Sequence, residues 1–298
     1  MNRREFLCAA AAVAAAGGCA TGAPPTVRVA AGEVGGFYHE FTDLLAAADP
    51  GAVHVRPVTT TGSQANLGLL ERGEADAAMA LADSVDAGGG GLVALGRVYE
   101  NYVQLVVAAE SPVRAVADLR GARISLGASG SGAALTGERL LRAAGLDPGG
   151  DVAVTHLALR EAVSALIGGG VDALLWAGGV PTGVLDVPGT LRLVDLGDLA
   201  RPLRDRFGYL YDLVVVPADA YPGTPAVRTI GVANLLVTTR SLPDATAAAV
   251  TELLIGRAER LVPDEAAGTQ FLDVRSLIGT AGVPLHPGAV AVYRRHHG

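Results

Sequence analysis

The sequence ANLGLLERGEADAAMAL, residues 65–81, is closely matched by EAVSALIGGGVDALLWA, residues 161–177. Both stretches place apolar residues at helical spacing, followed by glycine, an Asp-Ala pair and an apolar run. Each predicts a helix that ends at glycine and returns into a buried strand. We expect Asp76 and Asp172 to bond the backbone of that turn. The two copies indicate two similar α/β lobes with a cleft between them, unless such phrases recur by chance.

Strand and helix patterns alternate around these copies. A strand at 26–33 precedes a helix at 35–48, and a strand at 52–58 precedes a helix that Ser63 caps and Gly73 ends. The alternation favours parallel βαβ units. A strand over 102–108 crosses into the second lobe, whose helix at 131–146 is stopped by Gly145. A strand-rich stretch brings the chain back to a helix at 244–261. The crossings near Val106 and Val232 predict the hinge.

Composition narrows the range of functions. The chain has 298 residues, which favours two lobes, and a formal net charge of −7. All its basic side chains other than histidine are arginine, so the chain can form neither a lysine Schiff base nor a P-loop. No arginine cluster interleaved with aromatic residues is present, which argues against nucleic acid as a partner.

The first residues have the pattern of an export leader. Arg3 and Arg4 precede a short alanine-rich core, too short for a permanent membrane span. Residues 3–7 resemble the twin-arginine motif, and 16–19 resemble a lipobox whose Cys19 is lipidated. We expect a leader at 1–19 and a tether at 20–26. The alternative is an ordinary signal peptide. Cys8 and Cys19 are the only cysteines, so the mature chain would contain no disulfide.

Three loops rich in glycine, serine or threonine each follow a strand and precede a helix. They are residues 32–36, 59–63 and 127–132. Such loops leave free N–H groups at the positive end of the helix dipole, and glycine lets a ligand approach them. Two loops belong to the first lobe and one to the second, so a small carboxylate held between them would touch both. The alternative is that glycine serves only tight packing of helix on strand.

Patterns typical of enzymes are mostly missing from the sequence. No G-x-S-x-G elbow and no paired histidine metal motif are present. A small serine hydrolase would have to combine Ser129 or Ser131 with His156. We therefore expect no catalysis, no metal and no cofactor.

The runs at 29–41, 58–83 and 113–133, followed by DALLWAGGVPTG, IGVANLLVTTRSLP and PLHPGAVAVYR, resemble the TAXI family of TRAP-transporter solute-binding proteins. The resemblance covers nearly the whole mature chain. It implies an α/β, two-lobed periplasmic-binding-protein type II fold, each lobe a mostly parallel sheet flanked by helices, that closes like a Venus flytrap. It also implies delivery of a small carboxylate or amino acid, such as glutamate or glutamine, to integral membrane TRAP subunits.

Matching the family's motifs to this sequence implies a set of ligand-binding residues: Gly35, Gly36, Tyr38, Thr61, Ser63, Asp83, Ser129, Ser131, Gly132, Trp176, Gly178 and Pro181. The first loop departs from the family by carrying Glu33, Val34 and Phe37 in place of glycine and threonine. Ala133 replaces a hydroxyl residue, and Leu81-Ala82 stands where a glutamine is common. An added carboxylate and fewer donors make a ligand with an amine or amide, or a larger apolar part, more plausible than glutamate.

The predicted division is lobe 1 at 27–107 and 229–298, with lobe 2 at 108–228. We expect an exported, lipid-anchored monomer at the extracytoplasmic face of the membrane that binds a carboxylate-bearing solute. The alternative keeps the fold and places the chain in an ABC importer or a sensor system.

Overall fold

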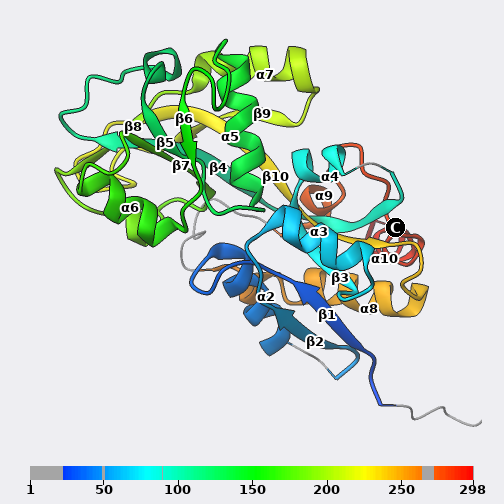
Figure 1. Cartoon of the computed structure of the whole chain (residues 1–298). Coiled ribbons are helices and arrows are strands. Elements are labelled where there is room, and N and C mark those ends of the chain that lie inside the picture. Colours follow the sequence, from blue (N-terminus) through cyan, green and yellow to red (C-terminus); the bar gives the residue numbers. More distant parts are fainter. Residues whose placement is uncertain (1–22, 49–50, 89, 264–271, 298) are drawn as a thin grey trace, which may run out of the picture.

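The computed structural model describes residues 23–48, 51–88, 90–263 and 272–297. The predicted leader, with Cys19, lies outside these residues, as does the start of the tether. Two α/β bodies, here called lobe 1 and lobe 2, are joined by two long strands (Figure 1). In the described part of the chain, no helix has the length and apolarity needed to cross a membrane.

Lobe 1 combines the N-terminal elements with the C-terminal helices. Its elements are β1 (Thr26–Ala30), α2 (Phe37–Ala47), β2 (His54–Val58), α3 (Ser63–Glu71), β3 (Ala77–Leu81), α4 (Ala82–Ala87), α8 (Asp244–Gly256), η4 (Ala258–Arg260), α9 (Val274–Leu277) and α10 (Pro287–His297). The strands β1–β2 and β1–β3 pair in parallel, as the alternating pattern predicts. The helix predicted at 244–261 is shorter: α8 ends at Gly256 and a 3-10 turn follows.

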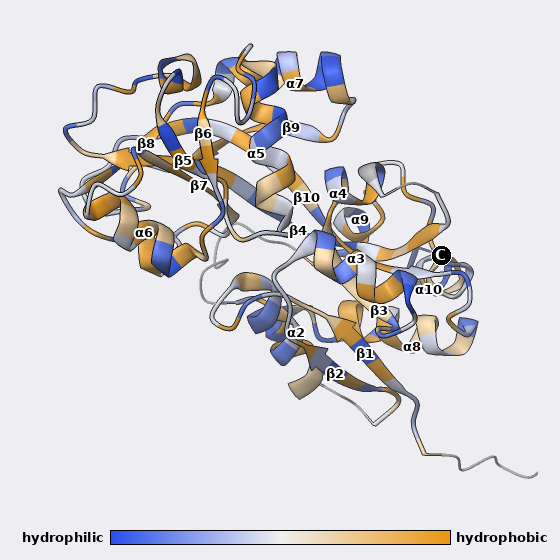
Figure 2. Ribbon diagram, in the orientation of Figure 1, coloured by the Kyte–Doolittle hydropathy of each residue, from blue (hydrophilic) through white to orange (hydrophobic). Residues whose placement is uncertain are grey.

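Lobe 2 is the continuous middle of the chain. Its elements are η1 (Val116–Leu119), β5 (Arg123–Ser125), α5 (Gly132–Ala143), β6 (Ala153–Thr155), α6 (Leu159–Ile167), β7 (Ala173–Gly178), η2 (Gly183–Leu185), β8 (Leu191–Val194), η3 (Gly197–Leu199), α7 (Ala200–Phe207) and β9 (Tyr211–Val216). The strands β5–β6 and β5–β7 are again parallel. Figure 2 shows hydrophobic residues concentrated in the strands of both lobes.

The two long strands are β4 (Leu92–Ala108) and β10 (Val227–Thr239), which pair antiparallel. They make the sheet continuous, in the order β2-β1-β3-β10-β4-β7-β5-β6, with β8 beside β4 and β9 beside β10. The first crossing strand therefore begins ten residues earlier than the predicted residue 102. Tyr99 of β4 packs in the hydrophobic core of lobe 1, whereas Val103 packs in the hydrophobic core of lobe 2.

Val106, the predicted hinge position on β4, pairs with Leu174 and Leu193 of lobe 2, and its role as a hinge stays a prediction. On β10 the change of core falls between Val232 and Ala233, beside the predicted position. The lobe boundaries 27–107 plus 229–298 and 108–228 stay a prediction.

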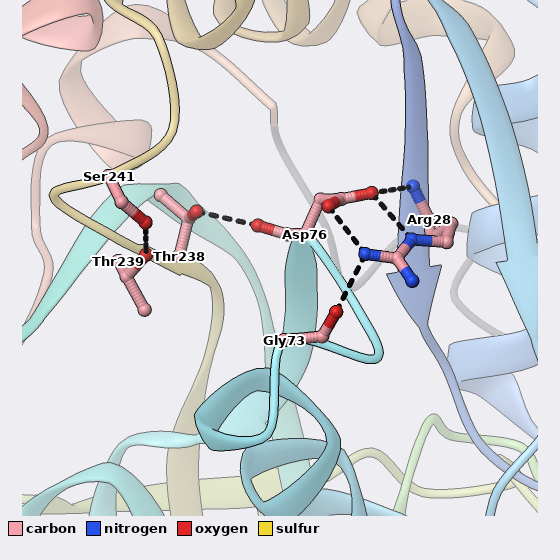
Figure 3. A network of polar contacts seen from close by, with 6 residues as sticks. All are labelled: Arg28, Gly73, Asp76, Thr238, Thr239 and Ser241. Carbon is pink, nitrogen blue, oxygen red and sulfur yellow. Dashed lines mark hydrogen bonds and ion pairs between the residues drawn. The ribbon is translucent and has the colours of Figure 1, made fainter.

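The repeated phrase forms the same unit in each lobe. In lobe 1 the Asp76 carboxylate accepts from the Arg28 amide at 2.8 Å and from two guanidinium nitrogens of Arg28 at 3.0 and 2.9 Å (Figure 3). In lobe 2 Asp172 makes the same three bonds to Arg123, at 2.8, 3.1 and 2.7 Å. The prediction that each aspartate bonds the backbone of its own turn is therefore wrong. Each aspartate ties its own strand to the parallel strand beside it.

Both predicted glycine stops are confirmed. Gly73 follows α3 with a φ of 67°, and Gly145 follows α5 with a φ of 76°, a left-handed conformation that glycine adopts without strain. The predicted cap of α3 is wrong, because Gly62 is the N-cap and Ser63 is already helical. The hydroxyl of Ser63 accepts the Leu81 amide instead, at 3.1 Å.

Candidate functional site

A pocket lies between the two lobes and encloses about 70 Å³. Lobe 1 lines it with the loop before α2, the loop before α3 and the end of β3, while β4 contributes one residue. Lobe 2 lines it with the loop and first turn of α5, the start of α6 and the end of β7. The lining residues are Gly32, Glu33, Gly36, Phe37, Tyr38, Thr61, Gly62, Ser63, Leu81, Asn101, Ala128, Ser131, Gly132, Ala133, Leu159, Trp176 and Ala177.

The structure brings seven of the twelve predicted ligand-binding residues together around this pocket. These are Gly36, Tyr38, Thr61, Ser63, Ser131, Gly132 and Trp176. The other five, Gly35, Asp83, Ser129, Gly178 and Pro181, are not among the residues that line it. All three predicted loops contribute, so the two lobes do meet at the carboxyl ends of their strands.

Two helices begin at the pocket with open amides. Ser131 caps α5, and its hydroxyl accepts from the Ala134 amide at 3.2 Å. The preceding amides, those of Gly132 and Ala133, make no hydrogen bond to the described part of the chain. The same holds for the Phe37 and Tyr38 amides in the first turn of α2. Both helix starts can therefore donate to an anion, assisted by the helix dipole.

The third helix is engaged by the protein itself. The amides of Gln64 and Ala65, in the first turn of α3, both bond the carbonyl oxygen of Gly130, at 3.0 and 3.2 Å. Gly130 belongs to lobe 2, so this contact joins the lobes. α3 therefore contributes less than expected: two amides of its first turn bind the opposite loop, and the Ser63 amide at the pocket is the one left without a hydrogen bond to the described part of the chain.

The lobes also approach closely at Gly132. A Cβ atom at this position would lie 2.5 Å from the Ser63 hydroxyl oxygen and 2.7 Å from Cδ1 of Leu81. Ser63 and Leu81 are both buried in lobe 1. Glycine is thus required here for the two lobes to come together.

A polar cluster stands behind the lobe 1 side of the pocket. The Tyr38 hydroxyl donates to Oδ1 of Asn234 at 2.5 Å and lies 3.3 Å from the Ser63 hydroxyl oxygen. Burial raises the pKa of the Tyr38 phenol well above its ordinary value, so Tyr38 stays neutral. Because its proton is directed at Asn234, Tyr38 can offer a ligand an acceptor oxygen rather than a donor.

Asn101 provides an acceptor that the protein leaves unused. It lies on β4 between the lobes, lines the pocket and is 4% exposed. Its Nδ2 donates to the Ala177 carbonyl at 3.1 Å, which fixes the direction of the amide. Its Oδ1 is buried and has no hydrogen-bond partner among the described residues. A buried acceptor without a partner is costly, so an N–H or O–H group placed beside it would be stabilised.

Electrostatically the pocket is unusual for a carboxylate site. Among the described residues that line it, none is arginine or histidine, and Glu33 is the one carboxylate. Burial, and next the nearby Glu161 carboxylate of α6, raise the pKa of Glu33. The side chains therefore make the pocket acidic, whereas the positive ends of α2 and α5 favour an anion. The site presents both signs of charge.

Asp83 has a different place from the one predicted. It is fully buried at the start of α4 in lobe 1. Its Oδ2 accepts from the hydroxyl groups of Thr136 and Tyr211 in lobe 2, at 2.7 and 3.1 Å. Burial raises its pKa, while these bonds and the nearby Arg139 lower it in part. Asp83 therefore ties the lobes together beside the pocket.

Trp176 forms one apolar wall, and its indole N–H donates to the Thr182 hydroxyl at 3.1 Å. Gly178 is the last residue of β7, and Pro181 lies in the loop that follows, after a cis peptide bond. A Cβ on Gly178 would lie 2.3 Å from Nε1 of Trp176, so this glycine makes room for the indole. Gly178 thus accommodates the wall, and neither Gly178 nor Pro181 lines the pocket.

The serine hydrolase alternative finds no support in the geometry. Nδ1 of His156 lies 3.2 Å from the Gly127 carbonyl oxygen, and the Ser131 hydroxyl caps α5. Neither Ser129 nor Ser131 bonds His156 within the described chain. The described residues also contain no group of three or more side chains able to hold a metal ion.

A family model described as the NMT1-like family matches residues 29–296. The chain belongs to this family. Among solved structures, a protein from Bordetella bronchiseptica RB50 aligns with a TM-score of 0.60 at 16% identity, over 92% of this chain and 98% of that one. The alkanesulfonate-binding protein SsuA from Xanthomonas axonopodis pv. citri, bound to MOPS, aligns with a TM-score of 0.53 at 21% identity, over 92% of this chain and 83% of that one.

These identities show the fold alone. This member of the NMT1-like family has the predicted two-lobed α/β fold of periplasmic solute-binding proteins. Ten of the seventeen lining residues lie outside the predicted set: Asn101, Leu159 and Ala177 were not considered as site residues, and Glu33 was considered only as an added carboxylate of the first loop. A signal existed for Asn101, because it stands with Glu100 and Gln104 among apolar residues of β4, and buried polar side chains are uncommon unless they have a partner.

Proposed function

We propose that this protein is an extracytoplasmic solute-binding protein that captures a small carboxylate-bearing solute between its lobes. The observation that carries the proposal is the pocket, where the first turns of α2 and α5, from opposite lobes, direct open amides at one small volume. Backbone amides can hold a carboxylate without arginine or lysine. Because each lobe supplies part of the site, binding would stabilise the closed arrangement.

We further propose the TAXI type, which would deliver the solute to TRAP-type membrane subunits. The resemblance of several sequence motifs along the chain supports this subtype. The ligand-binding residues that we propose are the seven predicted ones at the pocket: Gly36, Tyr38, Thr61, Ser63, Ser131, Gly132 and Trp176. The leader at 1–19 and lipidation of Cys19 would place the protein on the outer face of the membrane. Mass spectrometry of the membrane fraction would identify a lipidated Cys19.

The second candidate is a binding component of an ABC-type importer. The observation in its favour is the fold similarity to SsuA, which is an alkanesulfonate-binding protein. Neighbouring genes distinguish the two systems, because a TRAP role requires an integral membrane partner of that type encoded nearby.

The test is a thermal-shift screen against amino acids and organic acids. A ligand that binds only the folded protein raises the melting temperature by mass action, by about 2.7 kcal/mol of stabilisation at 100 times Kd. Trp176 is the sole tryptophan of the chain and lines the pocket, so its fluorescence should change with the same ligands. If no carboxylate in the screen changes either signal, the proposal is wrong.

A further inference from the structure

The pocket has two halves of opposite character. One half consists of donors, the Phe37 and Tyr38 amides of α2 and the Gly132 and Ala133 amides of α5. The other half carries the Glu33 carboxylate and Asn101, whose buried Oδ1 has no hydrogen-bond partner among the described residues. An anionic group satisfies only the first half.

From this division we infer that Asn101 and Glu33 form an amine-accepting subsite, so that the solute is a zwitterion with one carboxylate and one protonated amine. The inference rests on the proposed function and specifies its ligand. The carboxylate would bind the amides of α2 and α5. The ammonium group would donate to Oδ1 of Asn101 and sit beside Glu33. Asn101 is suited to this role because its Nδ2 is held by the Ala177 carbonyl, which keeps Oδ1 as the free end.

The charge of the pocket disfavours ligands that carry two acidic groups and ligands that lack an amine. A dicarboxylate, or an amino acid with an acidic side chain, brings a second negative charge into a pocket that already holds Glu33, whose pKa the exposed Glu161 nearby also raises. No arginine or histidine among the described lining residues offsets that charge. Like charges at short range repel, and burial strengthens the repulsion. A 2-hydroxy acid carries the carboxylate but leaves Glu33 without a cation.

The remaining walls of the pocket determine which side chain the ligand can carry beside its carboxylate and its amine. Phe37 and Leu81 of lobe 1 and Leu159 and Trp176 of lobe 2 line the pocket with apolar groups. The whole pocket has about 70 Å³ of free volume, which must hold the carboxylate and the ammonium group as well, so the side chain of the ligand must be small. The ligand class is therefore a small α-amino acid with an apolar side chain, and L-glutamate is disfavoured.

Calorimetry on the mature protein tests this assignment with matched compounds. L-Alanine, L-valine and L-leucine are each compared with their own 2-hydroxy acids, and L-glutamate, succinate and butanesulfonate complete the panel. We expect at least one of the three amino acids to bind about tenfold or more tightly than its hydroxy acid, since a hydrogen bond to a charged group contributes about this factor. L-Glutamate, succinate and butanesulfonate should bind more weakly than that amino acid.

Two variants test whether Glu33 and Asn101 cause the preference for an amine over a hydroxyl group. Glu33→Gln and Asn101→Leu should each reduce the preference for amine over hydroxyl about tenfold, while Glu110→Gln, at an exposed position in the turn after β4, should leave it unchanged. If Asn101→Leu does not fold, Asn101→Ala serves in its place: it also removes the acceptor oxygen and should reduce the preference likewise.

The outcomes separate the two proposals. Equal or tighter binding of the hydroxy acids, L-glutamate, succinate or butanesulfonate overturns the amine-accepting subsite and leaves the proposed function standing. A preference that survives Glu33→Gln and Asn101→Leu, or survives Glu33→Gln and Asn101→Ala where the leucine variant does not fold, overturns the assignment to these residues. If no compound of the panel or of the wider screen binds, the proposed function fails and the inference fails with it.

Discussion

Gly132→Ala tests whether the pocket forms by closure of the two lobes. Gly132 is the first residue of α5 in lobe 2, and it faces Ser63 and Leu81 of lobe 1. Alanine is the best helix former, so the substitution by itself favours α5. Its methyl group, however, would lie 2.5 Å from the Ser63 oxygen, whereas ordinary Cβ contacts lie at 3.4–4 Å. The lobes must therefore separate by about 1 Å at this point.

The lobe 1 side cannot easily yield. The Ser63 oxygen is held by the Leu81 amide at 3.1 Å, and Leu81 is buried at the end of β3. Overpacking of this kind costs about 1–3 kcal/mol. Because the cost falls on the closed arrangement alone, the closed population should fall about 5- to 150-fold relative to the open one. The apparent Kd of a ligand that needs closure rises by the same factor.

Two measurements check this reasoning. Calorimetry with the tightest amino acid of the panel gives the change in Kd, and small-angle scattering of the ligand-free protein should give a larger radius of gyration. Gly256→Ala is the matched control, since a Cβ there meets nothing within 4 Å. Unchanged affinity and unchanged scattering in a folded Gly132→Ala variant would refute closure at this contact.

Two further predictions concern stability. Burial raises the pKa of Glu100, on β4 between the lobes, to about 7 from its ordinary 4.5, with partial compensation by Arg97. The stability that this carboxyl contributes is therefore fully present below about pH 4.5 and lost as the pH rises through 7, by roughly 3 kcal/mol. Glu100→Gln should remove that loss, so its advantage over the natural protein in urea unfolding should grow between pH 5 and pH 8; a pH-independent difference would contradict this. Asp76→Ala and Asp172→Ala should each lower the free energy of unfolding by about 1 kcal/mol, because both ion pairs are partly exposed. The two losses should add to within about 0.5 kcal/mol, since the units lie in different lobes. Clear non-additivity in the double variant would show that the lobes do not act independently there.

The repeated phrase made much of the fold predictable because its determinants are local. Apolar spacing, the stops at Gly73 and Gly145, and the aspartate after the turn lie within one short stretch of sequence. The parallel pairing of the flanking strands follows from them. The extent of β4 was harder to predict, because its first ten residues gain their strand character from pairing with the distant β10.

The site was only partly predictable because its details depend on how one lobe meets the other. Ser131 has a local role as the cap of α5, and the loop pattern indicated it. The burial of Asp83 against Thr136, and the bond from α3 to Gly130, join residues more than 50 positions apart. No local pattern encodes such pairs. Asn101 likewise acquires meaning only once Ala177 fixes its amide.

The three helix starts therefore have separate tasks. The α3 amides bond the Gly130 carbonyl, a contact that favours closure whatever the solute. The α2 and α5 amides stay open to the ligand, which need supply only the remaining stabilisation of the closed form. A solute lacking a cation would close the lobes while bringing Glu33 and Glu161 together without compensation. Closure and selectivity are thus coupled. The α3 amides favour the closed arrangement of the lobes, and the Glu33 and Glu161 carboxylates determine which ligand stabilises it.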